Sequence, residues 1–195
     1  MLRKAALHLR AARTVLFGAI VLTLPPGAVA CGYHDDVSLA RGVLNWTYPD
    51  ALHVVGAMAQ AVSERRLPPP IFGRERDPWG YQRIVLLLDH YARRFRLPSE
   101  ETLPPAFSVL LIESMLWTRF APEGGELQSQ VHVSGPRAGD LVLISGEDVI
   151  REIANSRLSV GKAYRLGLVR LYGPEGQVRR FLALYDRVGG RPTVR

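Results

Sequence analysis

The sequence predicts an α+β protein in which a helical N-terminal zone is followed by an antiparallel or mixed sheet with helices on one face. Hydrophobic residues recur at helical spacing between residues 49 and 95, and they alternate along shorter stretches after residue 106. The proline-containing stretch "LPSEETLPP" separates the two patterns. We therefore divide the chain into a leader (1–30), a helical region (31–103), an α+β domain (104–189) and a tail (190–195).

The leader has the three zones of a secretory signal peptide: a basic start, an apolar run and a small-residue end. Its apolar run, "VLFGAIVLTL", is half of the ~20 residues that a membrane-spanning helix needs, and Pro25-Pro26 would end it as a helix. Ala28 and Ala30 supply the small side chains that signal peptidase accepts. The sequence therefore predicts export and cleavage before Cys31.

Cys31 is the only cysteine, so neither an internal disulfide nor a Cys-x-x-Cys pair can form. The segment "AVAC" resembles a bacterial lipobox, in which the cysteine becomes the first mature residue and carries lipid on its sulfur; Ala28 stands where that motif usually has Leu. The resemblance implies a membrane anchor at Cys31, with about 0.8 kcal/mol contributed by each buried methylene. A soluble exported protein with a free Cys31 and a retained signal anchor stay open as alternatives.

Two amphipathic helices are predicted in the helical region. In residues 49–66 Pro49 lies where a first-turn proline is tolerated, and the apolar face is Leu52, Val55, Met58 and Val62. After the breaker "LPPPIFGRERDP", residues 79–95 form a second helix. Its apolar face is Ile84, Leu87, Leu88, Tyr91 and Phe95.

The later part of the chain predicts the order strand, strand, strand, helix, helix, strand, helix. The strands are 107–120, 126–133, 140–144 and 168–173, the first two joined as a hairpin through "PEGGE". Ser145 is the expected N-cap of the helix in 146–156, with Asp148 completing a weak capping box. Ser159 is expected to cap a short helix that ends at Gly167, and residues 174–188 form the last helix.

The passage "GDLVLISGEDVIREIANSRLSVGKAYRLGLVRLYGP" resembles the second half of the sterol-carrier-protein (SCP2-like) fold, through its strand, capped helix, "SRLS" entry to a short helix and final strand. The resemblance extends over about residues 107–186 and implies that an apolar ligand binds in an internal tunnel. Apolar side chains between the predicted sheet and helices would form this slot, although filling of the core is the ordinary role of such residues. The slot residues are Ile112, Leu116, Trp117, Phe120, Leu143, Ile150, Ile153, Leu166 and Phe181.

Charge and motif content exclude several function classes. The chain has 25 basic and 18 acidic residues, but four of the basic residues and none of the acidic ones belong to the leader. The remaining 21 basic and 18 acidic residues give a net charge of only +3, which is too small to indicate nucleic-acid binding. The basic pairs at 65–66, 93–94 and 179–180 fit solvated helix faces, with contact to anionic lipid headgroups as a second interpretation. No Gly-x-Ser-x-Gly elbow, phosphate loop or metal-spaced histidine pair occurs, so we expect no catalytic residues, metal or cofactor.

The aromatic residues of "LNWTYPD" leave three alternatives open: core packing, a ligand lid or a contact with the membrane interface. Taken together, the sequence predicts a bacterial protein of the periplasm or cell envelope. It is anchored through a lipid on Cys31, with the outer membrane mildly favoured because no acidic residue follows the cysteine directly, and it binds an apolar ligand. The alternative function is an accessory lipoprotein that docks an envelope protein through helices 49–66 and 79–96.

Overall fold

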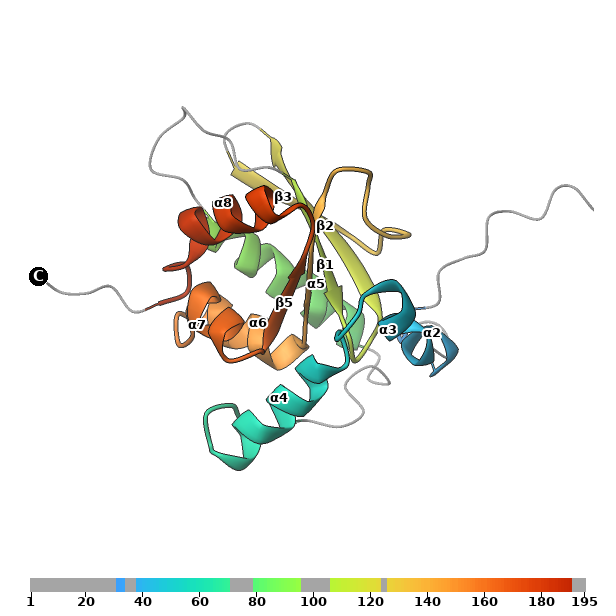
Figure 1. Ribbon diagram of the computed structural model, residues 1–195, viewed down its shortest axis with the longest axis vertical. Coiled ribbons are helices and arrows are strands. Elements are labelled where there is room, and N and C mark those ends of the chain that lie inside the picture. The colour runs from blue at the N-terminus through green and yellow to red at the C-terminus, as the bar shows by residue number, and fades with distance from the viewer. Residues whose placement is uncertain (1–30, 34–37, 71–78, 96–105, 124–125, 191–195) are drawn as a thin grey trace, which may run out of the picture.

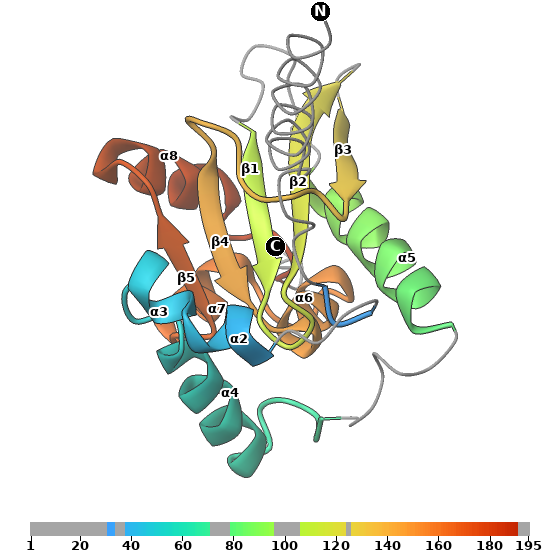
Figure 2. The ribbon, with the colours of Figure 1, turned by 90° about the vertical axis from the view of Figure 1, so that its right-hand side faces the viewer.

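The computed structural model describes residues 31–33, 38–70, 79–95, 106–123 and 126–190. Its centre is a five-stranded mixed sheet in the order β3-β2-β1-β4-β5 (Figures 1 and 2). Strands β1 and β4 run parallel, and the other neighbouring pairs are antiparallel. The predicted α+β class is therefore confirmed. The strands are β1 (Phe107–Leu111), β2 (Leu116–Glu123), β3 (Glu126–Val131), β4 (Leu141–Ser145) and β5 (Val169–Tyr172).

Helices pack on both faces of the sheet, and most lie on one. That face, which we call the helix face, is covered by α5 (Gly80–Ala92), the 3₁₀ turn η2 (Arg93–Phe95), α6 (Glu147–Ala154), α7 (Val160–Arg165) and α8 (Glu175–Tyr185). The short helices α2 (Ser38–Gly42) and α3 (Leu44–Thr47) lie on the opposite face, as Figure 2 shows. Helix α4 (His53–Ser63) lies beyond the sheet end at which β4 leads into α6 (Figure 2).

Alternation along the strands divides the buried side chains into two cores. On the helix face, Phe107 stacks on Phe120 with ring centroids 5.0 Å apart, and Phe95 meets Tyr185 at 4.7 Å. The opposite face has its own core around Leu110 and Ile144. The helix-face rings are almost completely buried, so they fill the layer between sheet and helices: Tyr91, Phe95, Phe107, Phe120, Phe181 and Tyr185.

The single strand expected over residues 107–120 is wrong, because the segment forms the β1–β2 hairpin. The chain reverses over residues 112–115, where Met115 takes a left-handed conformation with φ 51°. This turn has no glycine, proline or asparagine, so the usual sequence signal for a turn is absent. The apolar residues on both sides of it give one continuous hydrophobic run, which resembles a single buried strand.

The two long helices differ in how well the sequence located their buried faces. The predicted apolar face is confirmed, because its four residues in α5 and Phe95 in η2 are all buried. Helix α4 instead begins at His53, after a turn in which Asp50 has φ 64°, and it buries Val54 and Ala61 while Val55 is 45% exposed. Helix α4 itself carries apolar residues on several sides, so the spacing of its hydrophobic residues does not select one face for burial.

Candidate functional site: a charged row on α6 and the groove beside it

Glu113, in the turn after β1, caps the N-terminus of α6. The backbone N–H of Glu147 donates to both carboxylate oxygens of Glu113, at 3.1 and 3.3 Å. The expected Ser145 cap is wrong, since Ser145 ends β4 and its hydroxyl donates to the Leu168 carbonyl at 2.8 Å. A Cβ at Gly146 would collide with the ends of the Met58 and Glu113 side chains, so a larger residue there would have to displace the carboxylate from its present position.

The pKa of Glu113 is raised from 4.5 to about 7, chiefly by burial and in smaller part by the nearby negative charges of Glu147 and Asp148. Hydrogen bonds from the backbone oppose this shift. Arg41 donates to the main-chain carbonyls of Ile112 and Glu113, so it holds the turn that positions the carboxylate. Glu113 is therefore a carboxyl group that changes its charge near neutral pH.

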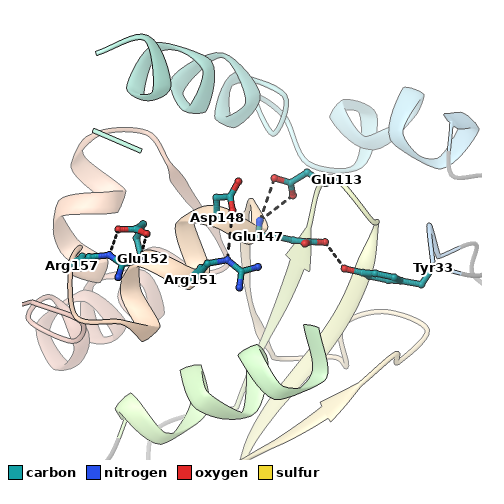
Figure 3. A network of polar contacts seen from close by, with 7 residues as sticks. All are labelled: Tyr33, Glu113, Glu147, Asp148, Arg151, Glu152 and Arg157. Carbon is teal, nitrogen blue, oxygen red and sulfur yellow. Dashed lines mark hydrogen bonds and ion pairs between the residues drawn. The ribbon is translucent and has the colours of Figure 1, made fainter. Parts of the chain in front are cut away.

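Residues 31–33 pack against the same turn. The Gly32 N–H donates to the Ser114 carbonyl at 2.7 Å, and the Tyr33 hydroxyl donates to Glu147 Oε1 at 2.7 Å (Figure 3). A Cβ on Gly32 would lie 3.2 Å from Ser114 Cα, which leaves little room for a larger residue. The Cys31 side chain is 1% exposed and belongs to the helix-face core. A lipid on its sulfur would therefore require this segment to move away from the turn.

Charged side chains follow α6 toward its C-terminal end, as Figure 3 shows. Arg151 Nε lies 3.7 Å from Asp148 Oδ1. Arg157 donates from Nε and Nη2 to the two carboxylate oxygens of Glu152, at 2.7 and 2.6 Å. This two-point contact is the strong form of an arginine–carboxylate pair and fixes the plane of the guanidinium.

A groove of about 820 Å³ separates this part of α6 from the end of α4. A smaller pocket of about 160 Å³ adjoins it and shares Arg66, Glu152 and Arg157 with it. The groove is lined by Val62, Arg65, Arg66, Leu67, Pro68, Pro69, Asp148, Arg151, Glu152 and Arg157. The smaller pocket adds Leu158, Lys162, Leu166 and Leu168. The site therefore combines apolar walls with a cluster of cations.

The two helices that border the groove end with the same backbone motif. After α4, the N–H groups of Arg65 and Arg66 donate to the carbonyls of Val62 and Ala61, at 2.9 and 2.7 Å. After α6, Ser156 and Arg157 repeat the pattern with Ile153 and Glu152, at 3.0 and 2.9 Å. These are Schellman motifs, and their left-handed residues are Arg65 (φ 57°) and Ser156 (φ 58°). Each motif therefore delivers an arginine, Arg66 or Arg157, to the groove.

The structure brings seven of the nine slot residues expected from the sequence to the helix-face core. Ile112 and Trp117 instead point to the opposite face, because neighbouring strand residues alternate. Apart from Leu166, which lines the smaller pocket, the helix-face members pack within the core. The seven are Leu116, Phe120, Leu143, Ile150, Ile153, Leu166 and Phe181.

Three buried hydroxyl groups interrupt the apolar layer on the helix face. Tyr91 Oη, Tyr185 Oη and Thr118 Oγ1 have no hydrogen-bond partner among the described residues. Burial raises the pKa of both tyrosines, and the interaction between them raises that of Tyr91 further. An unpaired buried hydroxyl costs about 1–3 kcal/mol, so a polar group brought into this layer would be stabilised by these hydroxyls.

Tyr48 and Trp46, whose roles the sequence leaves open, have different surroundings in the structure. Tyr48 packs on Trp117 and Tyr172, with ring centroids 5.9 and 5.2 Å apart. Trp46 is 88% exposed and lies near Leu39 and Val43, which are also exposed, on α2 and the start of α3. Core packing, the ordinary role of an aromatic residue, therefore applies to Tyr48 and fails for Trp46.

Ala28 and Ala30, at the predicted cleavage site, lie outside the described residues. Within the described ranges, no group of three or more histidine, cysteine, aspartate or glutamate side chains could hold a metal ion. None of the helices in these ranges is both long enough and apolar enough to cross a membrane.

Comparison with protein-family models gives no match, and comparison with curated proteins gives none either. Among solved structures, the chain is similar to the inverting sec-alkylsulfatase Pisa1 from Pseudomonas sp. (19% identity, 58% of this chain and 17% of that one, TM-score 0.36). It is also similar to a UbiJ-SCP2 ubiquinone synthesis protein (19% identity, 58% and 93%, TM-score 0.34). A third is a conserved hypothetical protein of Thermus thermophilus, described as a possible sterol carrier protein (15% identity, 58% and 86%, TM-score 0.30).

Two of these three structures carry SCP2 or sterol-carrier descriptions, as the sequence resemblance led us to expect. The matched part of this chain corresponds to less than a fifth of the alkylsulfatase. At these identities and TM-scores the likeness carries no argument about activity or ligand. The geometry of the site must therefore support any functional conclusion.

Proposed function

We propose that this protein is exported, is anchored to the cell envelope through Cys31 and binds an apolar, lipid-like ligand at the groove between α4 and α6. One observation carries the ligand proposal: the floor of the groove is continuous with the protein interior. Leu67, Leu158 and Leu168 line the two cavities and also belong to the helix-face core. An alkyl chain that displaced these leucines would meet further apolar side chains, where each buried methylene contributes about 0.8 kcal/mol.

The anchor proposal rests on the leader and on the position of Cys31, and it adds a conformational requirement. A cysteine that is only 1% exposed cannot carry acyl chains into a bilayer while residues 31–33 stay docked. In the lipidated form, the Gly32–Ser114 and Tyr33–Glu147 hydrogen bonds must therefore break. The exposed residues Leu39, Val43 and Trp46 would then follow the anchor closely in the chain, and tryptophan favours the membrane interface.

Intact-mass analysis and membrane fractionation of the native protein, beside a Cys31→Ala variant, test the anchor. Acyl mass on Cys31 and co-sedimentation with membranes, both lost in the variant, would support it, whereas an unmodified soluble chain would end it. Separately, binding of decanoate and decan-1-ol to the purified mature protein tests the ligand proposal. It fails if calorimetry detects no saturable binding of either compound.

A protein-docking function is the second candidate, because α5 exposes an apolar side chain opposite its buried face. Leu86 is 66% exposed, and Trp79, just before the helix, is 69% exposed. We expect a Leu86→Ser variant to lose crosslinks to an envelope partner if this function holds. Crosslinking that gives the same products with and without the substitution would exclude α5 as the docking face.

A further inference from the structure

The groove carries more positive than negative charge. Five cationic side chains line its two parts: Arg65, Arg66, Arg151, Arg157 and Lys162. Only two carboxylates, Asp148 and Glu152, line the same surface, and a third, Glu64, pairs with Arg66 from outside the lining. Arg65 and Lys162 have no carboxylate partner among the described residues. Positively charged groups in the groove are therefore available to bind an anionic ligand.

Arg157 is positioned before any ligand arrives. Its contact with Glu152, whose side chain is 10% exposed, occupies one N–H on Nε and one on Nη2. A guanidinium has five N–H donors, so three remain for another acceptor. Because Glu152 already restricts the side chain, binding an anion costs Arg157 little further conformational entropy.

Arg65 occupies a backbone position for which glycine is the favoured residue. Its φ of 57° is left-handed, and this position, the first after the C-cap in a Schellman motif, is usually glycine because a Cβ is disfavoured there. In the chain, Gly167 fills the corresponding position after α7, with φ 73°. An arginine at this position weakens the helix end and brings a cation to the groove.

We propose that the groove selects an anionic amphiphile, whose carboxylate or phosphate head binds the cluster of Arg65, Arg66 and Arg157. Its alkyl chain would lie along the leucine-lined floor of the groove. This inference rests on the proposed ligand-binding function and adds the chemical class of the ligand. Oxyanions suit the site because arginine presents paired N–H donors that match two oxygens of a carboxylate or phosphate.

Calorimetric titration of the mature protein with decanoate and with decan-1-ol separates the contribution of the anionic head group to binding from that of the alkyl chain. We expect decanoate to bind about tenfold more tightly, equivalent to about 1.4 kcal/mol. The preference should shrink in 1 M salt, because the Debye length falls to about 3 Å and the arginines are partly exposed. Equal affinities for the two compounds would overturn this inference and leave the proposed apolar-ligand function standing, whereas no binding of either compound removes both.

The informative variant is Arg65→Gly, because it removes the cation while stabilising the fold. Weaker binding by this variant therefore cannot be explained by unfolding. We expect it to raise the melting temperature by about 2 °C, since glycine accepts the left-handed conformation, and to weaken decanoate binding several-fold. Binding of decan-1-ol should not change. Undiminished decanoate affinity in a well-folded Arg65→Gly protein would overturn the proposed role of this arginine cluster.

Two control variants separate the two changes that Arg65→Gly makes, which are relief of a left-handed backbone position and loss of one positive charge. Ser156→Gly relieves the equivalent backbone position after α6 and keeps every cation, so it should raise stability and preserve decanoate binding. Arg180→Gln removes one positive charge from the exposed surface of α8, outside the groove. It should leave both properties unchanged, and a loss of binding equal to that of Arg65→Gly would show that overall charge, and not the groove, attracts decanoate.

Inorganic phosphate distinguishes an amphiphile site from a simple anion site. Competition between phosphate and decanoate, with no effect of phosphate on decan-1-ol, would support a shared oxyanion position. Phosphate binding that depends on Arg65, in a protein that does not bind decanoate, would overturn the amphiphile and identify a site for small anions.

Discussion

Replacing Glu113 by Gln should stabilise the protein at alkaline pH and have a small effect at acidic pH. In the folded state the pKa of Glu113 is about 7, compared with 4.5 for a solvated glutamate. The folded state therefore holds this proton more tightly than the unfolded state, so the contribution of Glu113 to stability decreases as pH rises from 4.5 to 7. The full difference corresponds to about 3 kcal/mol.

Glutamine retains the hydrogen bond that caps α6 and removes the charge. Its side-chain carbonyl can accept the Glu147 N–H that Glu113 accepts now. The charges that face this position are Glu147 and Asp148 of α6, and Arg41 contacts the turn only through main-chain carbonyls. The uncharged variant therefore avoids both the burial of a carboxylate and its repulsion by α6.

Urea unfolding followed by circular dichroism at pH 5, 6, 7 and 8 measures the effect. We expect the stability difference, Glu113→Gln minus wild type, to grow by about 2 kcal/mol between pH 5 and pH 8. The matched control is Glu175→Gln, on a side chain that is 83% exposed, for which we expect an almost constant difference. A difference for Glu113→Gln that stays constant or shrinks with rising pH would refute the argument.

Three further predictions concern stability and access. Ser159→Ala should cost about 1 kcal/mol in urea unfolding, because the Ser159 hydroxyl accepts the Lys162 N–H at 3.2 Å; no loss would mean that this cap contributes nothing. Tyr91→Phe should raise the free energy of unfolding by about 1 kcal/mol, because it removes a buried hydroxyl without a partner; a loss of stability would mean that the hydroxyl is bonded in solution. In unlipidated protein, Cys31 should react with a maleimide far more slowly than in urea, because its side chain is 1% exposed, and equal rates would show that residues 31–33 do not stay docked.

Local signals account for the parts of the fold that the sequence predicted correctly. The apolar face of α5 repeats at helical spacing within one segment, and the Ser159 cap and the Gly167 helix end involve residues at most five positions apart. The resemblance to an SCP2-like pattern in residues 140–174 also coincides with the observed strand, helix, helix and strand. None of these features requires knowledge of which distant segments meet.

The candidate site was found less completely, because its contacts join residues far apart in the chain. Glu113 caps a helix 34 positions later, and no local pattern marks it as a cap. For the pair Arg65-Arg66 the sequence indicated a solvated helix face, with contact to anionic lipid headgroups as a second interpretation, and it did not indicate a groove. One local pattern does mark the groove: the sequences "RRL" (65–67) and "SRL" (156–158) both follow amphipathic helices. In each, the leucine is buried and the arginine before it lines the groove.

The sequence by itself determined the class of the fold, the order of most elements and the helical stripe that covers the sheet. It also placed the only cysteine directly after a leader-like segment. Tertiary structure alone decided which face of α4 is buried, where residues 107–120 reverse and which charges meet beside α6. Periodicity and capping operate within a few residues, whereas these outcomes depend on burial of apolar area and on electrostatic contacts between segments that only folding brings together.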